Sequence, residues 1–355
     1  MELAIIGLPG SGRSALFEAV TAGRGEAMPS PVRIGVAHVQ DTRLKALAAL
    51  FNPRKTVPAE VRYANVSPPP PDWRGDILSR LGNVDAFLLV VRAFADDRVP
   101  HPEGSVDPHR DMAAMELELV FADLALLERR LERIREQGHK GKPQEREAMA
   151  QEQLLLSRLK AGLEQKVPLR EQAINAEESR LLEGFPLLST RPLLVVVNIG
   201  EEDLTQAATV EATWRQRYRR PGHQFIVLSA RLEMELCQLP AEEAAPFREA
   251  MGAPEPAVVR LVSLVYSLLG LATFFTTASS ELRAWPVPKD TPAQRAAGKI
   301  HSDMERGFIR AEVVSLENLA KAGSLAEARR HGQMRLEGKT YPVQDGDIIT
   351  FLFNI

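Results

Sequence analysis

The sequence has a single cysteine, Cys237, so an intrachain disulfide cannot form and a disulfide-stabilised secreted domain is excluded. It also lacks an apolar run long enough to cross a membrane, because the longest such stretch, residues 261–275, is interrupted by Ser, Tyr and Gly. The opening run, residues 2–6, leads straight into a glycine and predicts a buried strand, not a signal peptide. We therefore expect a cytoplasmic protein with no membrane partner.

The sequence also lacks a large excess of charge of either sign. A formal net charge of -3 over 355 residues excludes a globally basic nucleic-acid-binding protein, although a local basic surface is compatible with it. The composition, 45% hydrophobic and 26% charged, is typical of globular proteins. The length predicts two or three domains.

The most informative motif follows the first apolar run and reads Gly7-Leu8-Pro9-Gly10-Ser11-Gly12-Arg13-Ser14. A strand, a Gly-rich turn and a helix over residues 14–20 form the context of a phosphate-binding loop, in which backbone N–H groups face an anion. The pattern G-x-x-x-x-G-K-[ST] has lysine where Arg13 stands, and its hydroxyl, here Ser14, binds Mg²⁺. The alternative is a plain Gly-rich turn. The predicted phosphate-binding residues are Gly7, Pro9, Gly10, Ser11, Gly12, Arg13, Ser14 and Ala15.

Three further apolar runs, at residues 86–91, 193–197 and 225–228, predict strands separated by helical segments. Such continuous runs indicate a mostly parallel sheet that is covered by helices on both faces. The fold class is therefore α/β. A different composition begins near residue 279, where an alternating strand, a short helix over residues 293–300 and a final strand over residues 348–353 predict a small α+β domain.

Residues 111–183 are rich in Leu, Glu, Arg, Lys and Gln, and their leucines recur at three-, four- and seven-residue steps. Residues 138–143 interrupt this spacing, which predicts an inserted antiparallel helical hairpin, a coiled-coil arm, with its tip there. The tip is basic and could contact the phosphates of structured RNA. Basic residues interleaved with Glu also mark an ordinary solvated helix face. The basic residues are Arg129, Arg130, Arg133, Arg135, Lys140 and Lys142.

Three stretches in order resemble the YchF subfamily of Obg-type P-loop GTPases. The first leads into the arm at Val90-Val91-Arg92-Ala93-Phe94, and the second contains Asn198-Ile199-Gly200-Glu201 and Ser229-Ala230-Arg231. The third lies near the C-terminus at Ala297-Gly298-Lys299-Ile300-His301, Gly307-Phe308-Ile309-Arg310-Ala311-Glu312 and Val343-Gln344-Asp345-Gly346-Asp347. The resemblance implies a GTPase-like P-loop domain at residues 1–110 and 186–277, a helical arm at 111–185, and a β-grasp-like TGS domain at 278–355. Related proteins associate with ribosomes or RNA, so the arm and the TGS domain are the expected contacts.

The resemblance also implies a base-binding set. Asn198 to Glu201 match N-x-x-E, which this subfamily has where other GTPases carry N-K-x-D, and Ser229 to Arg231 match the S-A-[KR] loop that backs the base. The longer Glu201 implies relaxed or adenine-favouring specificity, so ATP and GTP remain alternatives as the bound purine nucleotide. Taken alone, Asn198 could cap a turn and Ser229 could cap a helix. The implied base-binding residues are Asn198, Ile199, Glu201, Ser229, Ala230 and Arg231.

The phosphate side departs from the family pattern. Asn65 stands where the family has a metal-associated aspartate, and Pro68, which has no N–H, stands where a glycine senses the γ-phosphate. Arg13 replaces the lysine, and Ser30 lies out of register for the switch threonine. These changes predict nucleotide binding with slow or no hydrolysis and leave Mg²⁺ an open question; they assign no catalytic residue. The alternatives are an active ATPase or GTPase rebuilt around residues such as Arg13, His38 or Asp72, and a non-enzymatic RNA or ribosome scaffold.

Overall fold

The structure is a computed structural model, and it describes residues 1–24, 31–67, 73, 75–137, 143–278 and 280–354. The chain divides into two compact units, Met1–Ala37 with Arg62–Leu264 and His38–Val61 with Val265–Ile355. We expected residues 38–61 and 265–277 in the nucleotide-binding domain, but they belong to the second unit. The reason is strand pairing: β3 (Lys55–Val57) and β8 (Leu271–Ala278) both pair with β9 (Glu281–Pro288). The three-domain division itself stays a prediction.

The first unit is built on a six-stranded sheet with the order β2-β4-β1-β5-β6-β7. The pairs β1–β4, β1–β5, β5–β6 and β6–β7 are all parallel, as the continuous apolar runs predicted. β5 and β6 are buried along their whole length, since helices cover both faces of such a sheet. The strands are β1 (Glu2–Ile6), β2 (Val32–His38), β4 (Glu60–Val66), β5 (Ala86–Arg92), β6 (Leu193–Asn198) and β7 (His223–Leu228).

Register brings the carboxyl ends of these strands together. Arg92 pairs with Asn198, Asn198 pairs with Leu228, and Ile5 pairs with Asn65. In an open α/β sheet, ligands bind in the crevice outside this edge. Among the described residues, the α-helices of this unit, apart from its arm, are α1 (Arg13–Thr21), α3 (Asp76–Gly82), α7 (Ala207–Arg217), α8 (Ala230–Leu236) and α9 (Ala241–Ala250), and the unit ends at Leu264 within α10 (Ala257–Leu268).

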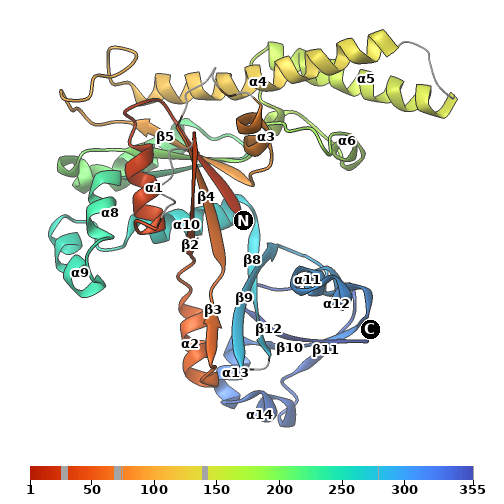
Figure 1. Ribbon diagram of the computed structural model, residues 1–355. Coiled ribbons are helices and arrows are strands. Elements are labelled where there is room, and N and C mark those ends of the chain that lie inside the picture. The colour runs from red at the N-terminus through yellow and green to blue at the C-terminus, as the bar shows by residue number, and fades with distance from the viewer. Residues whose placement is uncertain (25–30, 68–72, 74, 138–142, 279, 355) are drawn as a thin grey trace. The chain divides into compact units, whose positions relative to one another are not determined.

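The helical arm projects from the first unit after β5. It consists of α4 (Pro108–Gln137) and α5 (Pro143–Glu164), which lie side by side and run in opposite directions, followed by the short helix α6 (Ala176–Leu181) (Figure 1). The predicted leucine stripe forms their shared core, in which Leu127, Leu131 and Ile134 pack with Leu156 and Leu159. The hairpin prediction is thus confirmed, whereas its tip, with His139, Lys140 and Lys142, lies outside the described residues.

The second unit contains a mixed sheet with the order β11-β10-β12-β8-β9-β3. Its core combines Phe274, Val313 and Ile349 of the strands with Ala293 and Ala297 of a helix. The predicted terminal strand and the helix over residues 293–300 are both present. The remaining elements are α2 (Thr42–Phe51), α11 (Ala293–Ile300), α12 (Ser302–Arg306), β10 (Phe308–Ser315), α13 (Leu316–Ala322), α14 (Leu325–Arg330), β11 (Arg335–Glu337) and β12 (Asp347–Phe353).

The expected fold class is confirmed: an α/β protein with a mostly parallel sheet, an inserted helical arm and a C-terminal α+β domain (Figure 1). None of the helices in the described residues has both the length and the apolar character needed to cross a bilayer.

Candidate functional site: a loop between β1 and α1

The loop from β1 to α1 has the backbone conformation of a phosphate cradle. Gly7, Gly10 and Gly12 have φ values of 151°, 76° and 98°, which favour glycine over any other residue. Space excludes a side chain too, because a Cβ on Gly7 would lie 2.4 Å from the Val90 carbonyl oxygen, and a Cβ on Gly12 would lie 2.1 Å from Asn198 Nδ2. The glycines therefore permit both the turn and its close packing on the sheet.

Several backbone N–H groups in this loop make no hydrogen bond to the other described residues. The Ser11 amide donates to the Leu8 carbonyl at 3.2 Å, and the Leu16 amide donates to the Gly12 carbonyl at 3.0 Å. Within the described part of the chain, no hydrogen bond is made by the amides of the remaining loop and first-turn residues, Gly10, Gly12, Arg13, Ser14 and Ala15. Because these amides lie at the positive end of α1, they form a site suited to an anion such as a di- or triphosphate.

Arg13 turns its guanidinium toward the end of β4. Its Nη1 donates to the Val66 carbonyl, and its Nη2 donates to the Ser67 carbonyl at 3.1 Å. Burial lowers the pKa of Arg13 from its ordinary value, but an arginine keeps its charge in proteins. Two donors of the residue that replaces the phosphate-binding lysine are thus occupied by main-chain oxygens.

Asn198 connects the loop to the residues that were predicted to bind the base. Its Nδ2 donates to the Ser11 carbonyl at 2.8 Å, and its Oδ1 accepts from the Ala230 amide at 2.9 Å. The side chain is 4% exposed, so these bonds are made away from solvent. One N–H and one lone pair of the amide remain for a further partner.

The other predicted base-binding residues gather around the ends of β6 and β7. Ser229 caps α8, with its hydroxyl accepting from the Leu232 amide at 3.4 Å, which is the capping role considered from sequence. Ile199 packs in the core of the sheet. Arg231 is exposed and lies 3.9 Å from Glu201 and 2.9 Å from Glu235, so a basic and an acidic side chain flank this corner.

Asn65, at the end of β4, is almost fully buried, and its Oδ1 has no hydrogen-bond partner among the described residues. A buried acceptor left unpaired is unusual and costly. The residues that follow, including Pro68 and Asp72, lie outside the described part of the chain. His38 belongs to the second unit, where it lies 4.0 Å from Glu60.

Arg92 is a positioning residue that sequence reasoning did not assign. It is buried at the end of β5, and its guanidinium donates to the carbonyls of Phe94, Asp96 and Val99 at 3.0, 3.1 and 2.7 Å. These bonds hold residues 94–99 against the cradle, since a Cβ on Gly10 would lie 3.1 Å from Val99 Cγ1. The available signal was a lone arginine ending a fully apolar strand.

Comparisons with known proteins agree over the whole chain. Residues 271–354 match the YchF-GTPase_C family, which is described as a protein of unknown function. "Ribosome-binding ATPase YchF" of Bacillus subtilis is 38% identical, with 99% of this chain and 98% of that protein aligned. The Escherichia coli O157:H7 protein of the same name is 32% identical at the same coverages.

Two eukaryotic proteins extend the likeness. "Obg-like ATPase 1" of Caenorhabditis elegans is 31% identical over all of this chain and 92% of its own length. The solved structure of the Schizosaccharomyces pombe YchF GTPase superposes with a TM-score of 0.83 at 28% identity, covering 99% of this chain and 97% of that one. With identities above 30% along nearly its full length, the chain belongs to the YchF family.

Proposed function

We propose that the chain binds a purine nucleotide, ATP or GTP, with its phosphates on the amides of residues 10–15 and its base between Asn198 and the 229–231 loop. The observation that carries this proposal is the row of unpartnered amides at the start of α1. The first N–H groups of any helix lack intrahelical partners, and here the amides of Gly10 and Gly12 extend that row into the loop, where a diphosphate supplies acceptors. The names of the relatives, ribosome-binding ATPases, support the same reading.

The base side supports recognition of a purine. Asn198 keeps a free N–H and a free lone pair, and Glu201 supplies a carboxylate on the longer side chain of N-x-x-E. Arg231 balances that carboxylate at 3.9 Å, so a base that enters this corner meets a paired acidic group. Whether ATP or GTP binds more tightly then depends on the exocyclic groups that face Glu201.

Hydrolysis is proposed to be slow. Efficient phosphoryl transfer requires positive charge at the γ-phosphate and an ordered metal site. Arg13 donates to two carbonyls of the β4 end, and Asn65 offers a neutral amide in place of a carboxylate. Ser14, exposed on the first turn of α1, is the residue that would hold Mg²⁺ beside bound phosphates.

A second candidate is an active ATPase of the same fold. It is favoured by the printed names of the relatives, three of which contain the word ATPase. In that case Arg13 would leave the carbonyls of Val66 and Ser67 when a triphosphate binds, and its charge would serve the transferred group.

We also propose association with the ribosome in the cytoplasm, through the helical arm and the C-terminal TGS-like domain. The names of the bacterial relatives support a ribosomal partner. Co-sedimentation of the full chain with purified ribosomes measures this part of the proposal directly.

Calorimetric titration of the full chain with ATP, GTP and ADP, each with and without Mg²⁺, tests the nucleotide proposal. Binding that is weak and independent of the metal, with no phosphate released over many hours, is the expected result. Tight Mg²⁺-dependent binding with multiple turnovers would establish the active ATPase. No heat with any nucleotide would reject both and leave a scaffold whose cradle is unused.

A further inference from the structure

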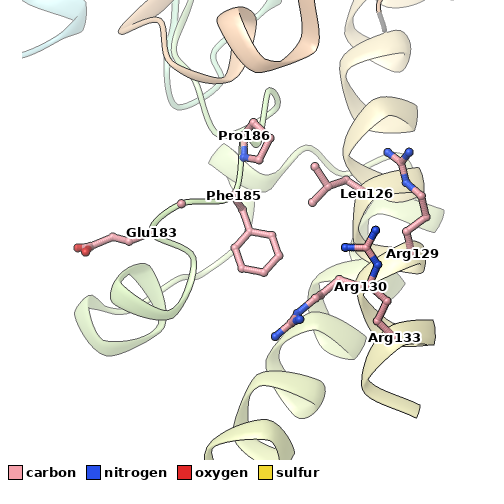
Figure 2. Close-up of a pocket in the computed structure, with 8 residues that line it drawn as sticks. Leu126, Arg129, Arg130, Arg133, Glu183, Phe185 and Pro186 are labelled. Atoms are coloured by element: carbon pink, nitrogen blue, oxygen red, sulfur yellow. The ribbon is translucent and has the colours of Figure 1, made fainter. Parts of the chain in front are cut away.

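A cavity of about 460 Å³ lies at the side of the helical arm, away from the residues of the nucleotide site. Leu126, Arg129, Arg130 and Arg133 of α4 form one wall, and the segment 183–186 forms the other (Figure 2). The two walls differ in character, because one is rich in guanidinium groups and the other presents the ring of Phe185 next to Pro186. A cavity of this size is within the range of ligand sites.

Hydrogen bonds hold the aromatic wall in place. Asp123 of α4 is buried and accepts from the amides of Leu188 and Ser189, both at 2.7 Å, which fixes the chain directly after the cavity to the helix. The Phe185 amide donates to the Leu182 carbonyl at 3.1 Å. The ring is therefore presented by a backbone that is ordered without a ligand, which reduces the entropy lost on binding.

The basic wall has charge that the protein itself does not neutralise. Arg130 is paired with Glu152 of α5 through two hydrogen bonds of 2.7 and 2.8 Å. Arg133 makes no ion pair or hydrogen bond among the described residues, and Arg129 uses only its Nε, on the Ala125 carbonyl at 3.1 Å. The Glu183 carboxylate points away from the arginines (Figure 2). Two guanidinium groups, one helical turn apart, remain available to an anion.

We propose that this cavity binds an unpaired nucleotide of RNA. The base would stack on Phe185, and the phosphates on either side of it would meet Arg129 and Arg133. Stacking of bases on aromatic rings beside arginines is the general way in which single-stranded nucleic acid is held. A peptide carboxyl terminus fits less well, because it carries one anionic group and no aromatic face, whereas an RNA strand carries successive phosphates and a base. This proposal rests on the proposed ribosome association, and the part of the ribosome that this face would contact is an unpaired nucleotide of its RNA.

The test measures binding of the full chain to a short single-stranded oligoadenylate that carries one fluorescent 2-aminopurine. Arg133→Ala and Arg129→Ala are compared with Arg135→Ala, which removes the same charge from an exposed position of the same helix outside the cavity lining. Phe185→Leu keeps an apolar side chain in the arm core but removes the ring. Circular dichroism and the unfolding midpoint of each variant verify that the arm stays folded.

We expect affinity for the oligonucleotide to fall about fivefold to tenfold in Arg133→Ala, Arg129→Ala and Phe185→Leu, and less than about twofold in Arg135→Ala. Replacing either cavity arginine with alanine should also reduce the slope of log affinity against log salt concentration by about one unit, whereas Phe185→Leu should leave this slope unchanged. The 2-aminopurine emission should be quenched by the wild type and not by Phe185→Leu.

Equal losses in Arg133→Ala and Arg135→Ala, or an unchanged affinity in Phe185→Leu, would overturn the cavity as a nucleotide site. So would tighter binding of a short peptide with a free carboxylate than of the oligonucleotide. Ribosome co-sedimentation distinguishes a failure of the cavity proposal from a failure of the proposed ribosome association. If the wild type sediments with ribosomes and the cavity variants do so equally, only this inference fails; if the wild type does not sediment, the proposed association fails as well.

Discussion

Asn198 gives the sharpest test of how the candidate site is held together. Its side chain bonds to the Ser11 carbonyl and to the Ala230 amide, and Ser11 and Ala230 are both buried. Asn198→Ala removes both bonds and leaves a carbonyl oxygen and an N–H group without partners. Each unpaired group costs about 1–3 kcal/mol, so the free energy of unfolding should fall by about 2–6 kcal/mol. Nucleotide affinity should fall about tenfold or more, because the carbonyl of Ser11 anchors the cradle.

Urea unfolding followed by circular dichroism measures the first effect, and calorimetry measures the second. Asn83→Ala is the matched control, since Asn83 is exposed and its Nδ2 makes one bond, to the Ser79 carbonyl at 2.9 Å. That control should change the free energy of unfolding by no more than about 0.5 kcal/mol. An Asn198→Ala protein as stable as the control, with unchanged nucleotide affinity, would refute the account of Asn198 as the connection between the two halves of the site.

Asn198→Asp tests the same contact in a second, independent way. The variant keeps the acceptor for Ala230 but places an oxygen against the Ser11 carbonyl, so one bond becomes a repulsion. Burial raises the pKa of the introduced carboxyl, and its protonated form can donate to that carbonyl again. A raised folded pKa means that the lost stability returns on acidification. The deficit of Asn198→Asp relative to wild type should therefore shrink as pH falls, and the deficit of Asn198→Ala should not.

Three other predictions follow from single residues. Arg13→Lys should raise triphosphate affinity about tenfold, or about 1.4 kcal/mol, because an ammonium lacks the planar fork that the guanidinium places on the Val66 and Ser67 carbonyls and is freer to reach the phosphates; unchanged calorimetric affinity would mean that the γ-phosphate pocket is absent. Glu201→Asp should shift the ATP/GTP affinity ratio toward GTP, and a constant ratio would remove this residue from base recognition. Burial raises the pKa of Asp123 from 3.8 to about 6, so its contribution to stability is full below about pH 4 and is lost as pH rises through 6; the stability difference between wild type and Asp123→Asn should fall by about 3 kcal/mol over that window.

Much of the architecture could be predicted because its signals are local. The apolar run before Gly7 and the fully apolar runs of β5 and β6 identify buried parallel strands, and the leucine spacing of α4 identifies one packed face. The cradle needs glycines at positive φ, so a Gly-rich turn between a strand and a helix predicts its geometry directly. These features depend on residues close in sequence, and periodicity reports such features well.

The unit boundaries could not be predicted in the same way. β3 has three residues, Lys55 to Val57, and no alternation that distinguishes it from a loop. Its partner, β9, lies more than 220 residues further along the chain, where Lys55 pairs with Glu281. That pairing, together with the packing of Leu44 and Leu47 of α2 against Phe275 and Leu282, assigns residues 38–61 to the second unit. A short strand whose identity is decided by a distant partner carries too little sequence pattern to reveal its sheet.

The contacts of Arg13 could not be predicted from the sequence for a related reason. The motif predicted a cation at the phosphates, but the guanidinium donates to the main-chain carbonyls of Val66 and Ser67. Every residue has a main-chain carbonyl, so the sequence does not show which one a side chain contacts. Asn65 was singled out for a lost carboxylate, and only the structure shows that its amide oxygen is buried without a partner. The altered positions at Arg13 and Asn65 therefore stay a prediction from the sequence, and only the structure shows the contacts of these side chains.

The residues on the base side and the backbone amides at the start of α1 differ in how strongly they indicate nucleotide binding. Asn198 would hold the loop to α8 whether or not a nucleotide ever binds, since its two bonds stabilise the fold, and Ser229 would cap α8 in either case. These residues are explained by structure alone. The loop before α1 is not explained in that way. Any helix leaves its first N–H groups unpaired, but Gly10 and Gly12, both at positive φ, add two amides that make no hydrogen bond among the described residues. The loop backbone is therefore the feature of this chain that favours nucleotide binding, and the role of the base-side residues in selecting the nucleotide stays a prediction.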